Sequence, residues 1–280
     1  ISSPDGIQYD EQFNRYYEYD NDLYLKLSNL RDNICNKKDL KKHSNDLKSI
    51  EKEITLFHAK IANDVQNSTK HSAISKHEII GFHGQTIFHN PEEKISVQLG
   101  DGKLLSQLTK KTVIYDFRQN DIKNGGQGAP LTPIFHQSLR NKISSNNAPI
   151  IFINIGGITN VTCFNSINKF DKPMFASDIG PGNCLIDEWI RKNSKEKYDK
   201  DGLIAKSGKL NELIFNQAID NFNITFNSSL DIKDFDISFV KGLSLEDGAS
   251  TLTNFTTEII VNNLSDLLNK NNYNLDEDLF

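Results

Sequence analysis

Short apolar runs that end in glycine-rich polar segments recur along this chain, and they constrain its fold more than any other feature. The runs are of β type, for example Ile79–Phe82, Thr112–Tyr115 and Ile150–Ile153. Apolar strands that alternate with helical patterns are typical of α/β folds, whose ligands bind in loops at strand ends. The sequence therefore predicts an α/β protein with a site assembled from several strand ends.

The polar segments combine glycine with amide, hydroxyl or carboxylate side chains. They are His83–Thr86, Gly100–Gly102, Asp121–Pro130, Asn154–Asn160 and Asp178–Asn183. Glycine lets backbone N–H groups approach a ligand closely, and successive N–H groups in such turns form concave anion sites. One such loop alone is more often a tight turn, but several in one chain favour a phosphorylated ligand. Gly156-Gly157 is the best candidate for phosphate contact.

The rest of the sequence indicates helices and a domain boundary. Apolar residues recur every three or four positions from Ile50 to Val65, which predicts an amphipathic helix packed on a sheet. Further helices are expected at Leu185–Lys192, Asn211–Asn221 and Leu252–Leu268. The polar stretch Arg140–Asn147 marks the expected boundary between an N-terminal α/β domain, residues 1–144, and a C-terminal α/β domain, residues 145–280.

Charge, cysteine count and missing motifs argue against several functions. Asp and Glu number 37 against 32 Lys and Arg, a net charge of −5 that is unfavourable for nucleic-acid binding. Cys35, Cys163 and Cys184 lie far apart, so neither a disulfide framework nor a structural zinc site is expected. No apolar run is long enough for a membrane span, and no secretory leader is expected. The P-loop, dinucleotide and hydrolase-elbow motifs are absent from the sequence.

Carboxylates and one imidazole at strand ends are the reactive candidates. Asp116 and Asp121 bracket Arg118, so one aspartate could be held by the guanidinium or by backbone donors while the other faces a ligand. A carboxylate within reach of a substrate hydroxyl or of water can act as a general base. For a single aspartate the commoner role is to cap a turn, and Asp178 is expected in such a turn. His83 follows the strand Ile79–Phe82 and could act on a ligand there, but a buried structural histidine explains it equally well.

In their order along the chain, these motifs resemble the anhydro-N-acetylmuramic acid kinases of bacterial cell-wall recycling. The likeness covers roughly residues 9–280 and is specific as a set, although each motif alone is weak. The matching segments are Gly81–Thr86, Val97–Gly102, Asp116–Asp121, Gly125–Leu131, Asn154–Asn160, Asp178–Asn183 with Asp187 and Trp189, and Tyr198–Asp201.

The resemblance implies a fold and a reaction. The fold is that of the actin-like ATPases: two ribonuclease-H-like α/β domains, the second incomplete in this chain, with nucleotide and substrate in the cleft between them. The reaction is ATP-dependent opening and phosphorylation of 1,6-anhydro-N-acetylmuramic acid to N-acetylmuramic acid 6-phosphate, with Mg²⁺ as the expected metal ion and its ligands unknown. Asp121 matches the catalytic base, which takes a proton from water that attacks the anomeric carbon.

The resemblance also assigns binding roles. Substrate contacts are expected from His83, Gln85, Thr86, Asp116, Arg118, Gln127, Asp178, Gly180 and Asn183. Nucleotide contacts are expected from Asn154, Gly156, Gly157 and Asn160, where Asn154–Gly157 resembles the second phosphate loop of the superfamily. The implied protein is cytoplasmic and acts on a small amino sugar, without nucleic-acid or membrane partners, and a homodimer is compatible with the likeness.

Three departures from the family pattern bear on activity. The family opens with a Met-Ser-Gly-Thr-Ser-Leu-Asp-Gly phosphate loop, whereas this chain has only Ser2–Ile7, so that loop is expected to be absent or replaced. The chain also stops before the family's Cys-Gly-Gly-Gly adenosine loop, and Ile179 stands where a threonine is usual. Two alternatives stay open. The missing segments are compatible with a non-catalytic homologue that binds sugar, or a partner chain, without phosphoryl transfer. The carboxylates are compatible with a glycosidase that uses two of Asp116, Asp121 and Asp178.

Overall fold

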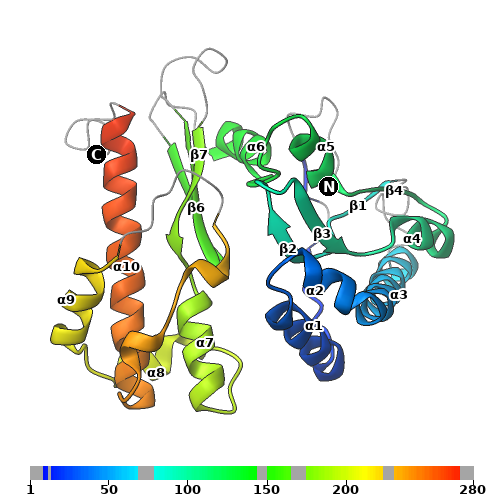
Figure 1. Ribbon diagram of the computed structural model, residues 1–280. Helices are drawn as coiled ribbons and strands as arrows, with labels where there is room; N and C mark the ends of the chain where they lie inside the picture. The colour runs from blue at the N-terminus through cyan, green and yellow to red at the C-terminus, as the bar shows by residue number, and fades with distance from the viewer. Residues whose placement is uncertain are drawn as a thin grey trace. The chain divides into compact units, whose positions relative to one another are not determined.

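The computed structural model describes residues 9–11, 14–68, 79–143, 150–164, 175–222 and 230–271. They belong to two compact units, Ile1–Ala129 and Pro130–Phe280 (Figure 1). The segment Ser2–Ile7, considered above as a replacement phosphate loop, lies outside the described residues. So does the junction between residues 144 and 145, and the domain boundary expected there stays a prediction.

The first unit combines helices with two small sheets. Its helices are α1 (Asn21–Asn33), α2 (Lys37–Lys42), α3 (Ser44–Ser68), α4 (Gly102–Thr109) and α5 (Phe117–Lys123). Its strands are β1 (Ile79–Phe82), β2 (Gln85–Asn90), β3 (Ile95–Leu99) and β4 (Thr112–Tyr115). The β1 and β4 strands pair in parallel, and β2 and β3 form an antiparallel hairpin. The crossover from β3 through α4 to β4 brings β4 beside β1, and α5 follows β4 directly.

The amphipathic helix expected from Ile50 to Val65 is confirmed as part of α3. Ile50 and Ile54 are 5% and 0% exposed and belong to the core of this unit, together with Leu99 of the hairpin and Leu105 of α4. Thr55 Oγ1 of α3 accepts a hydrogen bond from the Asp101 backbone N–H at 2.9 Å. Since Asp101 is the N-cap of α4, this contact fixes the start of α4 against α3.

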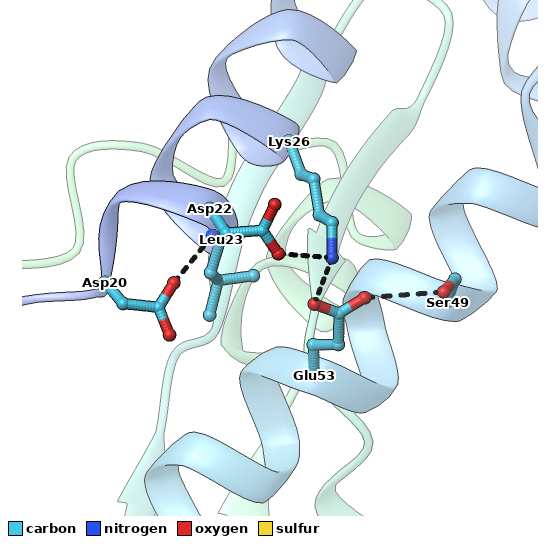
Figure 2. A network of polar contacts seen from close by, with 6 residues as sticks. All are labelled: Asp20, Asp22, Leu23, Lys26, Ser49 and Glu53. Atoms are coloured by element: carbon cyan, nitrogen blue, oxygen red, sulfur yellow. Dashed lines mark hydrogen bonds and ion pairs between the residues drawn. The ribbon is translucent and has the colours of Figure 1, made fainter.

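A polar network joins α1 to α3 (Figure 2). Asp20 caps α1, its Oδ1 accepting from the Leu23 N–H at 2.9 Å. Lys26 Nζ contacts Asp22 on α1 at 2.7 Å and Glu53 on α3 at 2.9 Å. These side chains are largely solvent-exposed, and exposed ion pairs contribute little to stability. The network therefore adds little to the stability of this unit, and the buried leucine and isoleucine side chains hold the two helices together.

The second unit is a three-stranded sheet with helices. Its strands β5 (Ile150–Ile155), β6 (Ile158–Phe164) and β7 (Phe175–Pro181) are antiparallel in the order β5-β6-β7. Its α-helices are α6 (Pro133–Ile143), α7 (Cys184–Asn193), α8 (Leu203–Ser207), α9 (Glu212–Asp220) and α10 (Leu245–Lys270). Short 3₁₀ turns lie at Lys200–Gly202, Ile232–Asp234 and Ser238–Val240.

Helices pack against both faces of this sheet. Val161 and Cys163 of β6 are fully buried in a cluster with Leu268 of α10, which runs alongside the sheet in Figure 1. Thr162 lies between them and faces the opposite way, because side chains alternate along a strand. On that second face His136 of α6 contacts Thr162 Oγ1 through Nδ1 at 2.8 Å, and its ring stacks on Phe152.

A second core in this unit forms where α7, α9 and α10 meet. Trp189 of α7 is 4% exposed, and its Nε1–H donates to the Leu245 carbonyl at 2.9 Å. Leu252 and Phe255 of α10 lie in the same cluster. A Cβ at Gly248 would lie 2.4 Å from the Trp189 ring, so the absence of a side chain there lets α10 approach α7 closely.

The expected helices at Leu185–Lys192, Asn211–Asn221 and Leu252–Leu268 are confirmed as α7, α9 and α10, the last extended at both ends. Two expectations about loops are wrong. Gln85 and Thr86 are in strand β2, and Asp178 is in strand β7, because their backbones join antiparallel ladders opposite Leu99, Gln98 and Asn160. Among the described helices, none is both long and apolar enough to cross a membrane.

Candidate active site

In the first unit, the chain after α5 folds back onto Asp121. The Gly126 N–H donates to the Asp121 carbonyl at 2.9 Å, and the Gly128 N–H donates to Asp121 Oδ2 at 2.7 Å. The Asp121 side chain is exposed, and within the described residues its Oδ1 has no hydrogen-bond partner. One carboxylate oxygen is therefore fixed while the other stays available, an arrangement suited to a general base.

The return loop approaches Asp121 so closely that position 126 has no room for a side chain. A Cβ on Gly126 would lie 2.1 Å from Asp121 Oδ2. By contrast, a Cβ on Gly125 meets nothing within 4 Å, although Gly125 has a φ of 91°. The glycine at 126 is thus required by the carboxylate, and the one at 125 by backbone conformation.

Gly126→Ala therefore tests whether the position of the Asp121 carboxylate matters for activity. The added methyl group must displace the carboxylate, and misplacement of a reacting group by about 1 Å can cost on the order of 10²-fold in rate. We expect kcat to fall by about that factor in Gly126→Ala and by less than about threefold in Gly125→Ala, whose left-handed backbone strain costs about 1 kcal/mol of stability. Equal kcat losses in the two variants would contradict this reading.

Arg118 and His83 form a second contact next to this loop. Arg118 Nη1 donates to the Gly128 carbonyl at 3.0 Å, and its Nε and Nη2 lie 3.3 and 3.1 Å from His83 Nε2. Because a guanidinium does not lose its proton, His83 Nε2 must be the unprotonated acceptor. His83 Nδ1 then carries the hydrogen and donates to the Gly84 carbonyl at 3.0 Å. His83 thus holds Arg118, and the structure brings both residues to the loop that fixes Asp121.

Asp116 lies at the N-cap position of α5, with a φ of 60° and no capping hydrogen bond from its side chain. Its side chain is exposed, as is that of Gln127 on the return loop. Of the two ways considered for holding an aspartate here, a backbone donor is the one seen, and it holds Asp121.

Gln85 and Thr86 face opposite sides of the β2–β3 hairpin. Gln85 Nε2 donates to Tyr19 Oη at 2.9 Å, and Tyr19 Oη lies 3.1 Å from His58 Nε2 on α3. Burial raises the pKa of Tyr19 and lowers that of His58. Thr86 Oγ1 accepts from Gln98 Nε2 at 3.4 Å. The hairpin therefore does not present these two expected substrate residues on one surface.

In the second unit, the turn between β5 and β6 is bonded to the start of α7. The Gly182 and Cys184 N–H groups donate to the Gly157 carbonyl at 2.9 and 3.2 Å, and the Asn183 N–H donates to the Gly156 carbonyl at 2.7 Å. A Cβ on Gly182 would lie 2.2 Å from the Gly156 carbonyl oxygen. The Gly156-Gly157 turn, with no side chains of its own, thus lies beside the positive N-terminal end of α7, whose first N–H groups donate to it.

The remaining expected residues of this unit lie on the sheet. Asp178 of β7 is 8% exposed, and its Oδ2 accepts from the Leu230 N–H at 2.8 Å. Asn160 of β6 pairs with Asn154 of β5 on one side and with Asp178 on the other. Gly180 packs closely on Ile259 of α10, where a Cβ would come within 2.9 Å of the Ile259 methyl group.

The sequence did not indicate the residues that hold Gln85 and helix α5 in place. Tyr19 and His58 contact Gln85, and Gln119 of α5 donates to the Ser96 carbonyl of β3. No local pattern marks them, because their partners lie far away in the chain.

Clusters of metal-ligating side chains or reactive cysteines among the described residues would indicate other chemistries. No group of three or more His, Cys, Asp or Glu side chains there is placed to hold a metal ion. All three cysteines are free. Burial raises the pKa of Cys163 to about 12 and that of Cys184 to about 11, so both remain thiols near neutral pH.

The sequence model of the anhydro-N-acetylmuramic acid kinase family matches residues 7–273. This chain belongs to the anhydro-N-acetylmuramic acid kinase family. A protein of that name from Pelagibacter ubique is 51% identical over 274 residues, which are 96% of this chain and 71% of the relative. Relatives of the same name from Zymomonas mobilis and Brucella canis are 40% and 38% identical, over 76% and 79% of this chain.

Part of the length of these relatives is not matched by this chain. The chain spans 57% of the Zymomonas protein and 59% of the Brucella protein. The expected resemblance is confirmed, together with the mixed α/β content that accompanies it.

Proposed function

We propose that this chain is an ATP-dependent kinase that opens 1,6-anhydro-N-acetylmuramic acid and phosphorylates it to N-acetylmuramic acid 6-phosphate. The observation that carries the proposal is the 51% identity, over 96% of this chain, to a protein named anhydro-N-acetylmuramic acid kinase. The glycine turns described above support it, since a phosphoryl-transfer enzyme needs backbone donors and positioning more than covalent help.

The proposal extends to the fold and the surroundings of the protein. The two units would belong to two ribonuclease-H-like domains of the actin-like type. The parallel β1–β4 pair and the antiparallel β5-β6-β7 sheet are the parts that fit this architecture. Action in the cytoplasm on a small amino sugar follows from the same family likeness, and the homodimer stays a prediction.

In this proposal Asp121 is the general base for the hydrolytic step. Its Oδ1 would take a proton from the water that attacks the anomeric carbon, while the Gly128 N–H holds Oδ2. The C1–O6 bond breaks in this step, and the freed 6-oxygen would receive the γ-phosphoryl group of ATP, with ADP leaving. Arg118, held by His83 and the Gly128 carbonyl, would bind an anionic or polar group of the sugar. Asp116, Gln127 and Asn183 keep the substrate roles proposed from the family pattern, as do Gln85 and Thr86.

The second unit would bind the nucleotide. The Gly156-Gly157 turn would lie next to the polyphosphate, because it has no side chain to block an approaching phosphate and the positive N-terminal end of α7 adjoins it. ATP supplies the phosphoryl group, and Mg²⁺ usually enters such sites on the phosphates with one or two carboxylates. The residues of this chain would orient the phosphates and exclude water.

A product assay tests the proposal. The purified chain is incubated with ATP, Mg²⁺ and the anhydro sugar, and the products are separated by liquid chromatography and identified by mass. Equal amounts of phosphosugar and ADP are expected. Sugar opening without ATP would instead indicate the glycosidase alternative, and sugar binding without turnover would indicate the non-catalytic homologue.

A further inference from the structure

Three polar residues form a row across the sheet of the second unit. Asn154 of β5 lies opposite Asn160 of β6, and Asn160 lies opposite Asp178 of β7. Directly opposite residues of antiparallel strands point to the same face, with Cβ atoms about 4.5–5.5 Å apart. Asn160 and Asp178 are therefore neighbours on the face whose preceding rung contains Phe152 and Thr162, the residues that contact His136 of α6.

Within this row, Asn160 has an unsatisfied atom. Its Oδ1 is buried and has no hydrogen-bond partner among the described residues. Buried side-chain oxygens are nearly always bonded, so an orphan in a candidate site points to a group that binds there. Asp178 beside it is 8% exposed, and the Leu230 N–H fixes its Oδ2.

The chemistry of the pair restricts what that group can be. An amide carbonyl oxygen and an ionised carboxylate only accept hydrogen bonds, and a buried carboxylate repels anions. The pair is therefore unsuited to a phosphate oxygen, although Asn160 follows the Gly156-Gly157 turn closely in sequence. The buried Asn160 Oδ1 is suited to a neutral O–H donor.

We infer that Asn160 Oδ1 accepts a hydrogen bond from the free ring hydroxyl of the sugar, next to the Asp178 carboxylate, so that Asn160 is a substrate-specificity residue and not a nucleotide contact. This inference rests on the proposed function. In a 1,6-anhydro-N-acetylmuramic acid, C1 and C6 share the bridging oxygen, C2 bears the acetamido group and C3 the lactyl ether. The hydroxyl at C4 is then the one ring hydroxyl available as donor.

The test separates the sugar from the nucleotide. Asn160→Ala removes the acceptor, and loss of one such hydrogen bond is worth about tenfold in affinity. We expect the KM for sugar to rise about tenfold, the KM for ATP to change less than about twofold, and Asn160→Ser, which keeps an acceptor, to recover part of the loss. Asn262→Ala, on the exposed side of α10, is the matched control and should leave both constants unchanged.

Calorimetry with a 4-deoxy analogue completes the test. The analogue should bind the wild type and Asn160→Ala equally, because the group that Asn160 recognises is absent from it. Two results would overturn the inference while leaving the kinase proposal standing. One is a rise in the KM for ATP alone in Asn160→Ala. The other is a loss of affinity for the 4-deoxy analogue in Asn160→Ala that equals the loss for the sugar itself. A wild-type chain that binds no sugar would overturn both.

Discussion

Asp121→Asn is expected to lower kcat at least about 10²-fold, the usual contribution of a general base, with little change in either KM. The substitution keeps the size of the side chain and an oxygen that can still accept from the Gly128 N–H, so the return loop should stay in place. Only the ability to take a proton is lost. Steady-state turnover with ATP, Mg²⁺ and the anhydro sugar measures the effect.

Two further aspartate variants make this result specific. Asp220→Asn, on the exposed side of α9, serves as the charge control and should be fully active. Asp178→Asn should mainly raise the KM for sugar, because Asp178 is proposed to bind substrate. If Asp178→Asn lost turnover and Asp121→Asn kept it, the base would be the buried carboxylate on β7 and the assignment of Asp121 would be wrong.

Leu252→Ala should destabilise the second unit by about 2–5 kcal/mol, the range for truncating a fully buried leucine. Leu252 is 0% exposed in the cluster around Trp189, and its removal leaves a cavity between α10 and α7. The chain contains a single tryptophan, so Trp189 fluorescence reports unfolding of this unit alone. Urea titrations followed by this signal give the free energy of unfolding.

Val261→Ala is the matched control for that experiment. Val261 lies on the same helix and is 52% exposed, and surface substitutions of this kind usually change stability by less than about 0.5 kcal/mol. A loss below about 1 kcal/mol in Leu252→Ala, or equal losses in both variants, would contradict the packing of α10 on α7 described here.

Local sequence pattern predicted the helices better than the placement of the polar residues. The three- and four-residue spacing from Ile50 to Val65 reflects burial of one helix face, and α3 buries that face. Asp178 was expected in a turn because glycine and proline follow it closely. Its ladder partner Asn160 lies in another strand, and pairing across a sheet leaves no signal next to the residue it orders.

In the candidate site, too, the sequence indicated local segments but not the contacts between residues that lie far apart in the chain. Glycine-rich segments after strands are visible in the sequence. One of them, Gly125–Gly128, folds back onto Asp121, and another, Gly156-Gly157, forms the β5–β6 turn. The contact between Arg118 and His83, 35 residues apart, and the bonds from Gly182 to Gly157 depend on how the chain folds back. Such contacts fix which nitrogen of His83 accepts and which glycines tolerate no side chain, and neither could be deduced from spacing.

The most direct test of the kinase proposal is the identity of the product formed from 1,6-anhydro-N-acetylmuramic acid. Mass spectrometry of the reaction with ATP and Mg²⁺ should show N-acetylmuramic acid 6-phosphate and ADP in equal amounts, and no opened sugar when ATP is omitted. Opened, unphosphorylated sugar in the absence of ATP, or intact anhydro sugar in its presence, would contradict the assignment of this chain as an anhydro-sugar kinase.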